Sequence, residues 1–237
     1  MKFLIINNRN QSSLERLIKS LDEKITGNWC YSIFDSTNKI DWKDRSKLNL
    51  TQNLKDWLLE QIDGESDDLY SIIDENKFLI EGFDVEDIIK EMSNDDVFCF
   101  SLSLGKNITF CSNMNCENIF KPLSDEGKVL SWDWSVHYFD FGYPLNLDGT
   151  VFRGKEMRKF VKGIHFDNSL ELENSLQIFD NYPKNIMSGF QNGKMVEIVF
   201  ENQDLWSTFD HNKLPKDRIK YQIFEKNEAP DKVSNEI

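Results

Sequence analysis

Apolar and polar residues follow one another along the first part of the chain in blocks that predict strands and helices in turn. The apolar run 2–6 predicts a buried strand, and the leucines and isoleucines of 14–25 recur at helical spacing behind Ser12 and Ser13, which can cap a helix. Residues 29–34 are β-prone. A strand, a helix and a strand in this order favour a parallel sheet with helices on its faces.

The same pattern continues beyond this opening unit. It predicts helices over 48–62, 83–92, 155–164 and 169–179, strands over 69–73, 97–102, 108–111 and 195–200, a polar loop over 37–47 and irregular chain over 112–155. No internal repeat or linker divides the sequence. We therefore expect one α/β domain over 1–225, built on a mixed, mainly parallel sheet flanked by helices, and a polar tail over 226–237.

The charge balance narrows the classes of partner. The 237 residues include 28 basic and 41 acidic ones, for a net charge of −13 and an isoelectric point near 4.7. Nucleic-acid binding and docking on anionic lipid both depend on clustered Lys and Arg, so we expect neither. A phosphorylated small molecule remains possible where a metal ion or a local basic group offsets the repulsion.

Apolar runs and cysteines indicate the compartment. The run Phe3 to Ile6 is too short for a signal peptide or a spanning helix, and no later apolar run approaches the length that a membrane span needs. The four cysteines have neither C-x-x-C nor zinc-site spacing. We therefore expect a cytoplasmic protein with reduced cysteines and no transmembrane segment.

Polar residues follow three of the predicted strands, where the ligands of open α/β sheets bind. These groups are Asn7 to Asn10, Asp35 with Ser36, and Asp74-Glu75-Asn76. Adjacent carboxylates at a strand end can hold Mg²⁺ or Mn²⁺, which prefer oxygen ligands and often share a site with substrate phosphates. The alternative is an ordinary solvated acidic turn, which is common after strands.

Two later segments also combine groups that suit a sugar ligand. Trp132-Asp133-Trp134 and the stretch 140–153 bring aromatic faces and carboxylates together, as polyhydroxylated rings require. The alternative is that these aromatics fill the core and that Asp148 belongs to a turn. Glu171 and Glu173 follow at a helix start; being two residues apart, they do not share a helical face, and the helix dipole alone can explain acids there.

Several common enzyme classes lack their motifs here. The sequence has no G-x-S-x-G, no Walker A loop, no G-x-G-x-x-G and no H-E-x-x-H. Hydrolases with a nucleophile elbow, P-loop enzymes, dinucleotide-binding enzymes and zinc peptidases are therefore not expected.

Four segments taken together resemble one family. VFCFSLSLGKNITFCSNM (97–114), LSWDWS (130–135), DFGYPLNLDGTVFR (140–153) and NSLELEN (168–174) are similar to bacterial glycosyltransferase-like proteins of the GT-A class, related to family 2 glycosyltransferases. The resemblance covers roughly residues 1–200 and is most specific over 97–174. It implies a GT-A-like domain with a nucleotide-binding half, 1–104, and an acceptor half, 105–225.

The resemblance also implies a reaction. A metal-dependent enzyme of this kind moves a sugar from a nucleotide-sugar donor to a glycan or another hydroxyl acceptor, and family 2 enzymes invert the anomeric centre. The metal, Mn²⁺ or Mg²⁺, stabilises the departing diphosphate. A carboxylate removes the proton of the acceptor hydroxyl, which is worth about 10²–10⁴-fold in rate.

Roles for single residues follow from the same resemblance. The metal and the diphosphate are expected at Asp74, Glu75 and Asn76, where the third position departs from the family's D-x-D motif. The general base is expected at Asp148, with Glu171 and Glu173 as further candidates. Contacts with the nucleotide-sugar are expected from Asn8, Arg9, Asp35, Lys106, Trp132, Asp133, Trp134 and Arg153, of which Asp35 would face the base.

Two other functions remain open from the sequence. The departure at Asn76 favours a non-catalytic module that binds a nucleotide-sugar or a glycan, or that partners another enzyme. An unrelated α/β protein that handles phosphate through Asp74 is the other possibility. Nucleotide binding without turnover distinguishes the module from the transferase.

Overall fold

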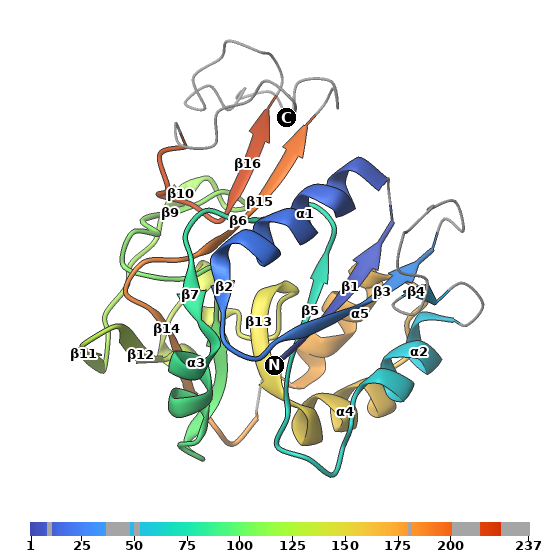
Figure 1. Cartoon of the computed structure of the whole chain (residues 1–237). Helices are drawn as coiled ribbons and strands as arrows, with labels where there is room; N and C mark the ends of the chain where they lie inside the picture. The colour runs from blue at the N-terminus through green and yellow to red at the C-terminus, as the bar shows by residue number, and fades with distance from the viewer. Residues whose placement is uncertain (9–10, 37–47, 50–52, 180–181, 201–213, 224–237) are drawn as a thin grey trace.

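A computed structural model describes residues 1–8, 11–36, 48–49, 53–179, 182–200 and 214–223. The loop predicted over 37–47, the tail 226–237 and Arg9 lie outside these residues. In the described part, a nine-stranded mixed sheet forms the centre of the molecule (Figure 1). Its strand order is β11 (Ser124–Glu126), β12 (Val129–Asp133), β14 (Ile186–Phe190), β8 (Val97–Ser101), β13 (Asp148–Arg153), β5 (Leu69–Asp74), β1 (Lys2–Asn7), β3 (Cys30–Asp35) and β4 (Leu48–Asn49).

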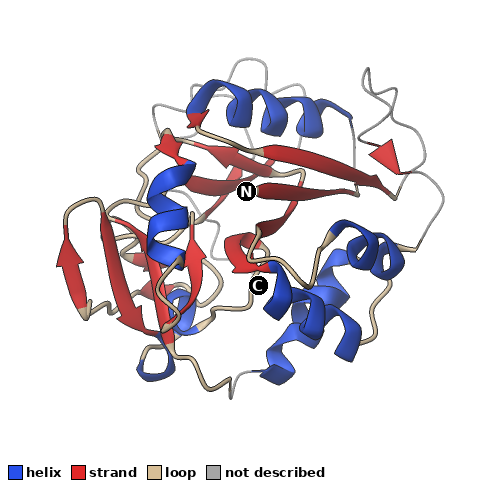
Figure 2. Cartoon of the chain, turned by 60° about the horizontal axis from the view of Figure 1, so that its bottom comes forward, coloured by secondary structure: helices blue, strands red, loops and turns tan. Residues whose placement is uncertain are grey.

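Helices cover both faces of this sheet because its inner strands are apolar on both sides. In β1, Phe3 and Ile5 pack with α1 (Gln11–Lys24) and α3 (Val85–Met92). Leu4 and Ile6 point the other way, towards α2 (Leu54–Gln61), α4 (Gly154–Gly163) and α5 (Ser169–Leu176). Figure 2 shows α1 on one side of the sheet and the other group of helices on the opposite side. The predicted α/β fold is confirmed.

The opening unit and the parallel pairing also follow the prediction. β1 pairs in parallel with both β3 and β5, so Asn7, Asp35 and Asp74 reach the same edge of the sheet. The helix predicted over 48–62 begins only at Leu54, because the Asn53 side chain accepts the backbone N–H of Asp56 and caps it. Likewise, Asp84 caps α3, which therefore begins two residues later than the sequence pattern suggests.

The segment 112–155 is more regular than predicted. It contains β10 (Cys116–Glu117), which pairs with β9 (Phe110–Cys111), the strands β11, β12 and β13, and the 3₁₀ helices η2 (Trp134–Val136) and η3 (Phe139–Gly142). Strand β13 lies between β5 and β8, in the middle of the large sheet. The expectation of irregular chain was wrong because the abundance of Gly, Asp and Asn obscured two strands whose apolar residues alternate or are buried on both faces.

Smaller elements complete the described chain. A three-stranded sheet joins β6 (Lys77–Leu79), β15 (Met195–Phe200) and β16 (Lys220–Ile223), and only β15 was expected. Strand β2 (Ile25–Thr26) pairs with β7 (Phe83–Asp84), and η4 (Gln177–Phe179) follows α5. The large sheet takes strands from both predicted halves, 1–104 and 105–225, and the division between the halves stays a prediction.

No helix among the described residues combines the length and the apolar character of a membrane span.

Candidate active site

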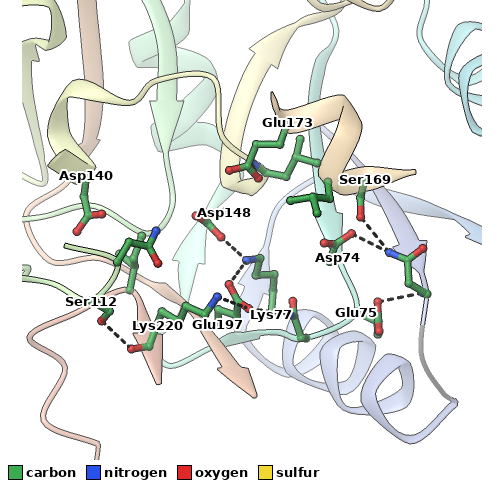
Figure 3. Close-up of a pocket in the computed structure, with 16 residues that line it drawn as sticks. Asp74, Glu75, Lys77, Ser112, Asp140, Asp148, Ser169, Glu173, Glu197 and Lys220 are labelled. Carbon is green, nitrogen blue, oxygen red and sulfur yellow. Dashed lines mark hydrogen bonds and ion pairs between the residues drawn. The ribbon is translucent and has the colours of Figure 1, made fainter. Parts of the chain in front are cut away.

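A pocket of about 380 Å³ opens where the carboxyl ends of β1 and β5 meet the start of β13. The three-stranded sheet, the start of α5 and the loop after β9 close it (Figure 3). Its charged lining consists of Asp74, Glu75, Asp140, Asp148, Glu173 and Glu197 together with Lys77 and Lys220. The pocket is therefore acidic, with ammonium groups placed among the carboxylates.

On one side of the pocket, Asn8 links β1 to α5. Its side-chain amide donates to Ser169 Oγ at 3.0 Å and to Asp74 Oδ1 at 3.4 Å. Burial raises the pKa of Asp74 to about 6, although the nearby Lys77 ammonium and the Ser169 hydroxyl counteract part of this rise. Asp74 thus stands at the pocket with a carboxylate whose charged form is poorly solvated.

The expected ligands Asp74, Glu75 and Asn76 do not converge on one point. Glu75 accepts the backbone N–H of Asn8 at 3.2 Å, whereas the Asn76 amide donates to Glu197 at 2.9 Å. Among the described residues, no group of three or more His, Cys, Asp or Glu is arranged to hold a metal ion. The D-E-N turn therefore does not fit the single divalent ion that the sequence suggested.

A buried lysine lies where the carboxylates of two sheets approach each other. Lys77 Nζ is ion-paired with Asp148, at the start of β13, and with Glu197 of β15 at 3.0 Å. Burial alone would lower the pKa of Lys77, but Asp148 and Glu197 outweigh it and raise that pKa. Lys220 also reaches Glu197, at 3.4 Å, so that one carboxylate serves two ammonium groups.

Glu173 is held on the opposite wall by a backbone donor. The backbone N–H of Leu147 donates to Glu173 Oε2 at 3.2 Å, which fixes the carboxylate beside the start of β13. Burial, followed by repulsion from Asp148, raises the pKa of Glu173. A carboxylate that holds a proton more tightly than usual at a pocket wall suits proton transfer.

Several predicted residues lie away from the pocket. Glu171, two residues before Glu173, is exposed and accepts the N–H of Asp167 at 2.8 Å, as expected for a helix start. Asp35 is buried beside Asn7, whose amide donates to it at 2.9 Å. It is not among the residues that line the pocket.

The aromatic residues of the predicted sugar-binding segment fill the core. Trp132 is fully buried, and its indole N–H donates to the carbonyl of Phe141 at 3.0 Å. Trp134 is buried as well, while Asp133 accepts the N–H of Ser135 and caps η2. Neither indole can stack on a sugar in this arrangement, because each is packed among other apolar side chains.

Two of the three predicted cations, Arg153 and Lys106, have their partners outside the pocket. Arg153 is buried and donates to the carbonyls of Val97 and Asn94, both at 2.8 Å. Lys106 forms an exposed ion pair with Asp125 at 2.5 Å. They thus hold loops together and line no part of the pocket.

Lys77, Asp140, Ser169, Glu197 and Lys220 are pocket residues that the sequence did not single out. The sequence does contain a signal for Lys77 and Glu197. Lys77 follows directly on the D-E-N turn, and Glu197 is a lone acid in the apolar strand Met195–Phe200. The two residues are register partners in antiparallel strands. Finding them needed the pairing of β6 with β15, which residue types alone do not give.

Comparison with known proteins identifies the fold. No family model and no curated protein matches the chain. Among solved structures, residues 1–349 of S. aureus TarS, a glycosyltransferase, in complex with UDP-GlcNAc match with a TM-score of 0.53 and 12% identity, over 88% of this chain and 61% of that one. The same segment without that ligand gives a TM-score of 0.50 and 16% identity, over 82% and 59%. The chain thus has a glycosyltransferase-like fold and spans about three fifths of those structures.

Proposed function

We propose that the chain is a glycosyltransferase that transfers a sugar from a nucleotide-sugar to a hydroxyl acceptor. The observation that carries this proposal is the acidic pocket, in which Asp74, Asp148 and Glu173 meet at the carboxyl ends of the sheet strands. Ligands of open α/β sheets bind at this edge. The likeness of the fold to a TarS structure solved with UDP-GlcNAc supports the choice of donor class.

In the proposed reaction, Glu173 is the general base and Asn8 and Asp74 hold hydroxyls of the donor. The acceptor oxygen attacks the anomeric carbon, and its proton passes to Glu173. The bond from the anomeric carbon to the diphosphate oxygen breaks, and its electron pair leaves with the diphosphate. A single displacement of this kind inverts the anomeric centre.

Glu173 is preferred to Asp148 as the base because of their partners. The Asp148 carboxylate is already engaged by the Lys77 ammonium, whereas burial raises the pKa of Glu173. Proton transfer to a positioned carboxylate contributes about 10²–10⁴-fold.

The experiment is a thermal-shift series with UDP, UDP-GlcNAc and other nucleotide-sugars, each in EDTA and in Mn²⁺. A ligand at 100 times its Kd stabilises the folded state by about 2.7 kcal/mol, which raises the Tm of a chain of this size by about 5 to 10 °C. Release of free nucleoside diphosphate then measures turnover. A flat Tm with every nucleotide-sugar in both buffers rules the proposal out.

One observation favours a second function, a non-catalytic nucleotide-sugar or glycan-binding module. Asp148, the first candidate for the base, is ion-paired with Lys77, and Glu75 and Asn76 of the D-E-N turn bind different partners, Asn8 and Glu197. A Tm rise with a nucleotide-sugar but no release of diphosphate with any acceptor would establish this module.

A further inference from the structure

The positive charge at the centre of the pocket is the ammonium group of Lys77. The Lys77 side chain is 5% exposed, and its ammonium lies between Asp148 and Glu197 in Figure 3. These carboxylates come from β13 and β15, in different sheets, and Asp74 lies close enough for its charge to act on Lys77. A cation thus already occupies the meeting point of acids from three strands.

The backbone fixes Lys77 in this position. β6 begins at Lys77, directly after the turn that leaves β5, and pairs with β15 so that Lys77 and Glu197 are register partners. A buried ammonium is costly unless it is paired and hydrogen-bonded, and the two carboxylates meet that need. Lys77 is therefore a built part of the pocket rather than a surface side chain that happens to fold over it.

A divalent ion would compete with this ammonium. Mg²⁺ and Mn²⁺ need several oxygen ligands, and the carboxylates of Asp148 and Glu197 already bind Lys77. An ion that took these ligands would leave a buried ammonium unpaired, and an ion beside them would be repelled by it. The Asn76 amide engages Glu197 from its other side and reduces its availability further.

The ammonium still has capacity for a ligand. An ammonium has three N–H donors, and among the described residues Lys77 uses them on two partners, Asp148 and Glu197. Lys220, which shares Glu197 and lines the same pocket, adds a second ammonium. Phosphate oxygens can accept from such groups, since lysine is a common phosphate-binding residue.

We propose that the Lys77 ammonium takes the place of the divalent ion in this pocket, so that the chain binds the diphosphate of a sugar nucleotide without a metal. The part that concerns the diphosphate rests on the proposed function. The part that concerns the metal stands on the acid cluster alone: the acids form a cation site whose cation is Lys77.

The test is to titrate the whole chain with Mn²⁺ and to measure binding as the loss of the electron paramagnetic resonance signal of free Mn²⁺. The wild-type chain is expected to show no saturable Mn²⁺ binding up to millimolar concentration. Lys77→Met removes the ammonium at similar length and frees Asp148 and the Oε2 atom of Glu197, while the Oε1 atom keeps Lys220 and Asn76. This variant is expected to bind one Mn²⁺ at least tenfold more tightly than the wild type. Lys194→Met is the matched control, because Lys194 is also ion-paired and largely buried but does not line the pocket; it should gain no site.

Opposite results overturn the proposal. Stoichiometric Mn²⁺ binding by the wild type that Asp148→Asn abolishes would place a metal where we place Lys77. The same conclusion follows if folded Lys77→Met gains no Mn²⁺ site. Circular dichroism and Tm show whether that variant folds, and the wild-type titration decides the matter if it does not.

The diphosphate part has its own readout. The Kd of the wild type for UDP-GlcNAc is expected to agree within twofold in EDTA and in Mn²⁺. A tenfold tighter Kd in Mn²⁺ would refute the inference and leave the proposed function standing. If UDP-GlcNAc binds in neither buffer, the proposed function fails for this donor, while the Mn²⁺ titrations still decide the role of Lys77.

Discussion

Two regions of the sequence carry residues suited to a sugar nucleotide, but the fold places only one of them at the pocket. The polar residues that end β1 and β5 converge on one pocket, because parallel neighbours bring their carboxyl ends to the same edge. In the run from Trp132 to Phe141, the rings of Trp132, Trp134 and Phe141 instead turn inward, and Phe141 stacks on Phe120 at 4.2 Å between centroids. In this protein, position relative to a strand end therefore locates the site better than residue type does.

The largest effect is expected at the base. Glu173→Gln keeps the acceptor for the Leu147 N–H but cannot take a proton, so sugar transfer should fall by about 10²–10⁴-fold while the Kd for the donor changes little. Glu171→Gln is the matched control on the same helix and should leave transfer unchanged, since Glu171 is exposed. Nucleotide-release kinetics and calorimetry measure the two quantities. Equal losses in both variants would remove Glu173 from its assigned role.

The aromatic region should respond in stability rather than in binding. Trp132→Ala leaves a cavity in a fully buried site and should destabilise the fold by about 3–5 kcal/mol in urea unfolding. Tyr138→Ala, at a side chain that is 78% exposed, should cost little. The Kd of the folded Trp132 variant for UDP-GlcNAc should stay within twofold of the wild type. If instead affinity collapses and stability holds, the indole contacts the sugar and the comparison fails.

Substitution of Arg153 should likewise reduce stability rather than nucleotide-sugar binding, but by less. Arg153→Met removes the guanidinium bonds to the carbonyls of Val97 and Asn94, of which Asn94 keeps the N–H of Val97, and should cost about 1–3 kcal/mol in free energy of unfolding. Lys106→Met removes only an exposed ion pair and should change stability little. Neither should change donor affinity. If either variant keeps its stability but binds the nucleotide-sugar more weakly, that residue contacts the nucleotide-sugar after all.

A pH-dependent effect on stability is expected from the carboxylate of Asp74. The pKa of Asp74 is raised from 3.8 to about 6 in the folded chain, so its ionisation opposes folding above pH 6. Asp74→Asn should therefore be more stable than the wild type by about 1–3 kcal/mol at pH 8, because a pKa unit corresponds to about 1.36 kcal/mol. This advantage should shrink as the pH falls from 6 to 4, where the wild-type group becomes protonated in both states. Urea unfolding at three pH values checks this, and a pH-independent difference would show that the charge of Asp74 is not the cause.

The sequence predicted the part of the fold that short-range pattern determines. The strand–helix–strand opening and the polar ends of β1 and β5 follow from hydrophobic spacing, and so Asn8 and Asp74 could be placed at a ligand site. Glu173 was one of three candidate acids, and only the register of α5 against β13 separates it from Glu171.

The rest depends on contacts between distant segments. The aromatic run could not be assigned to the core before the pairing of β12 with β14 was known, since ring faces suit a sugar and a core equally well. Lys77 and Glu197 lie 120 residues apart, and their meeting depends on the pairing of β6 with β15. Residue types in one sequence do not give long-range strand pairing of this kind.

The most direct test of the whole account is the structure of the chain crystallised with UDP-GlcNAc in EDTA. The sugar diphosphate should lie in the pocket, with the Lys77 ammonium within hydrogen-bond distance of a phosphate oxygen and the Glu173 carboxylate facing the anomeric carbon. A nucleotide-sugar bound at another edge of the sheet, or against the aromatic run with this pocket left to solvent, would contradict it.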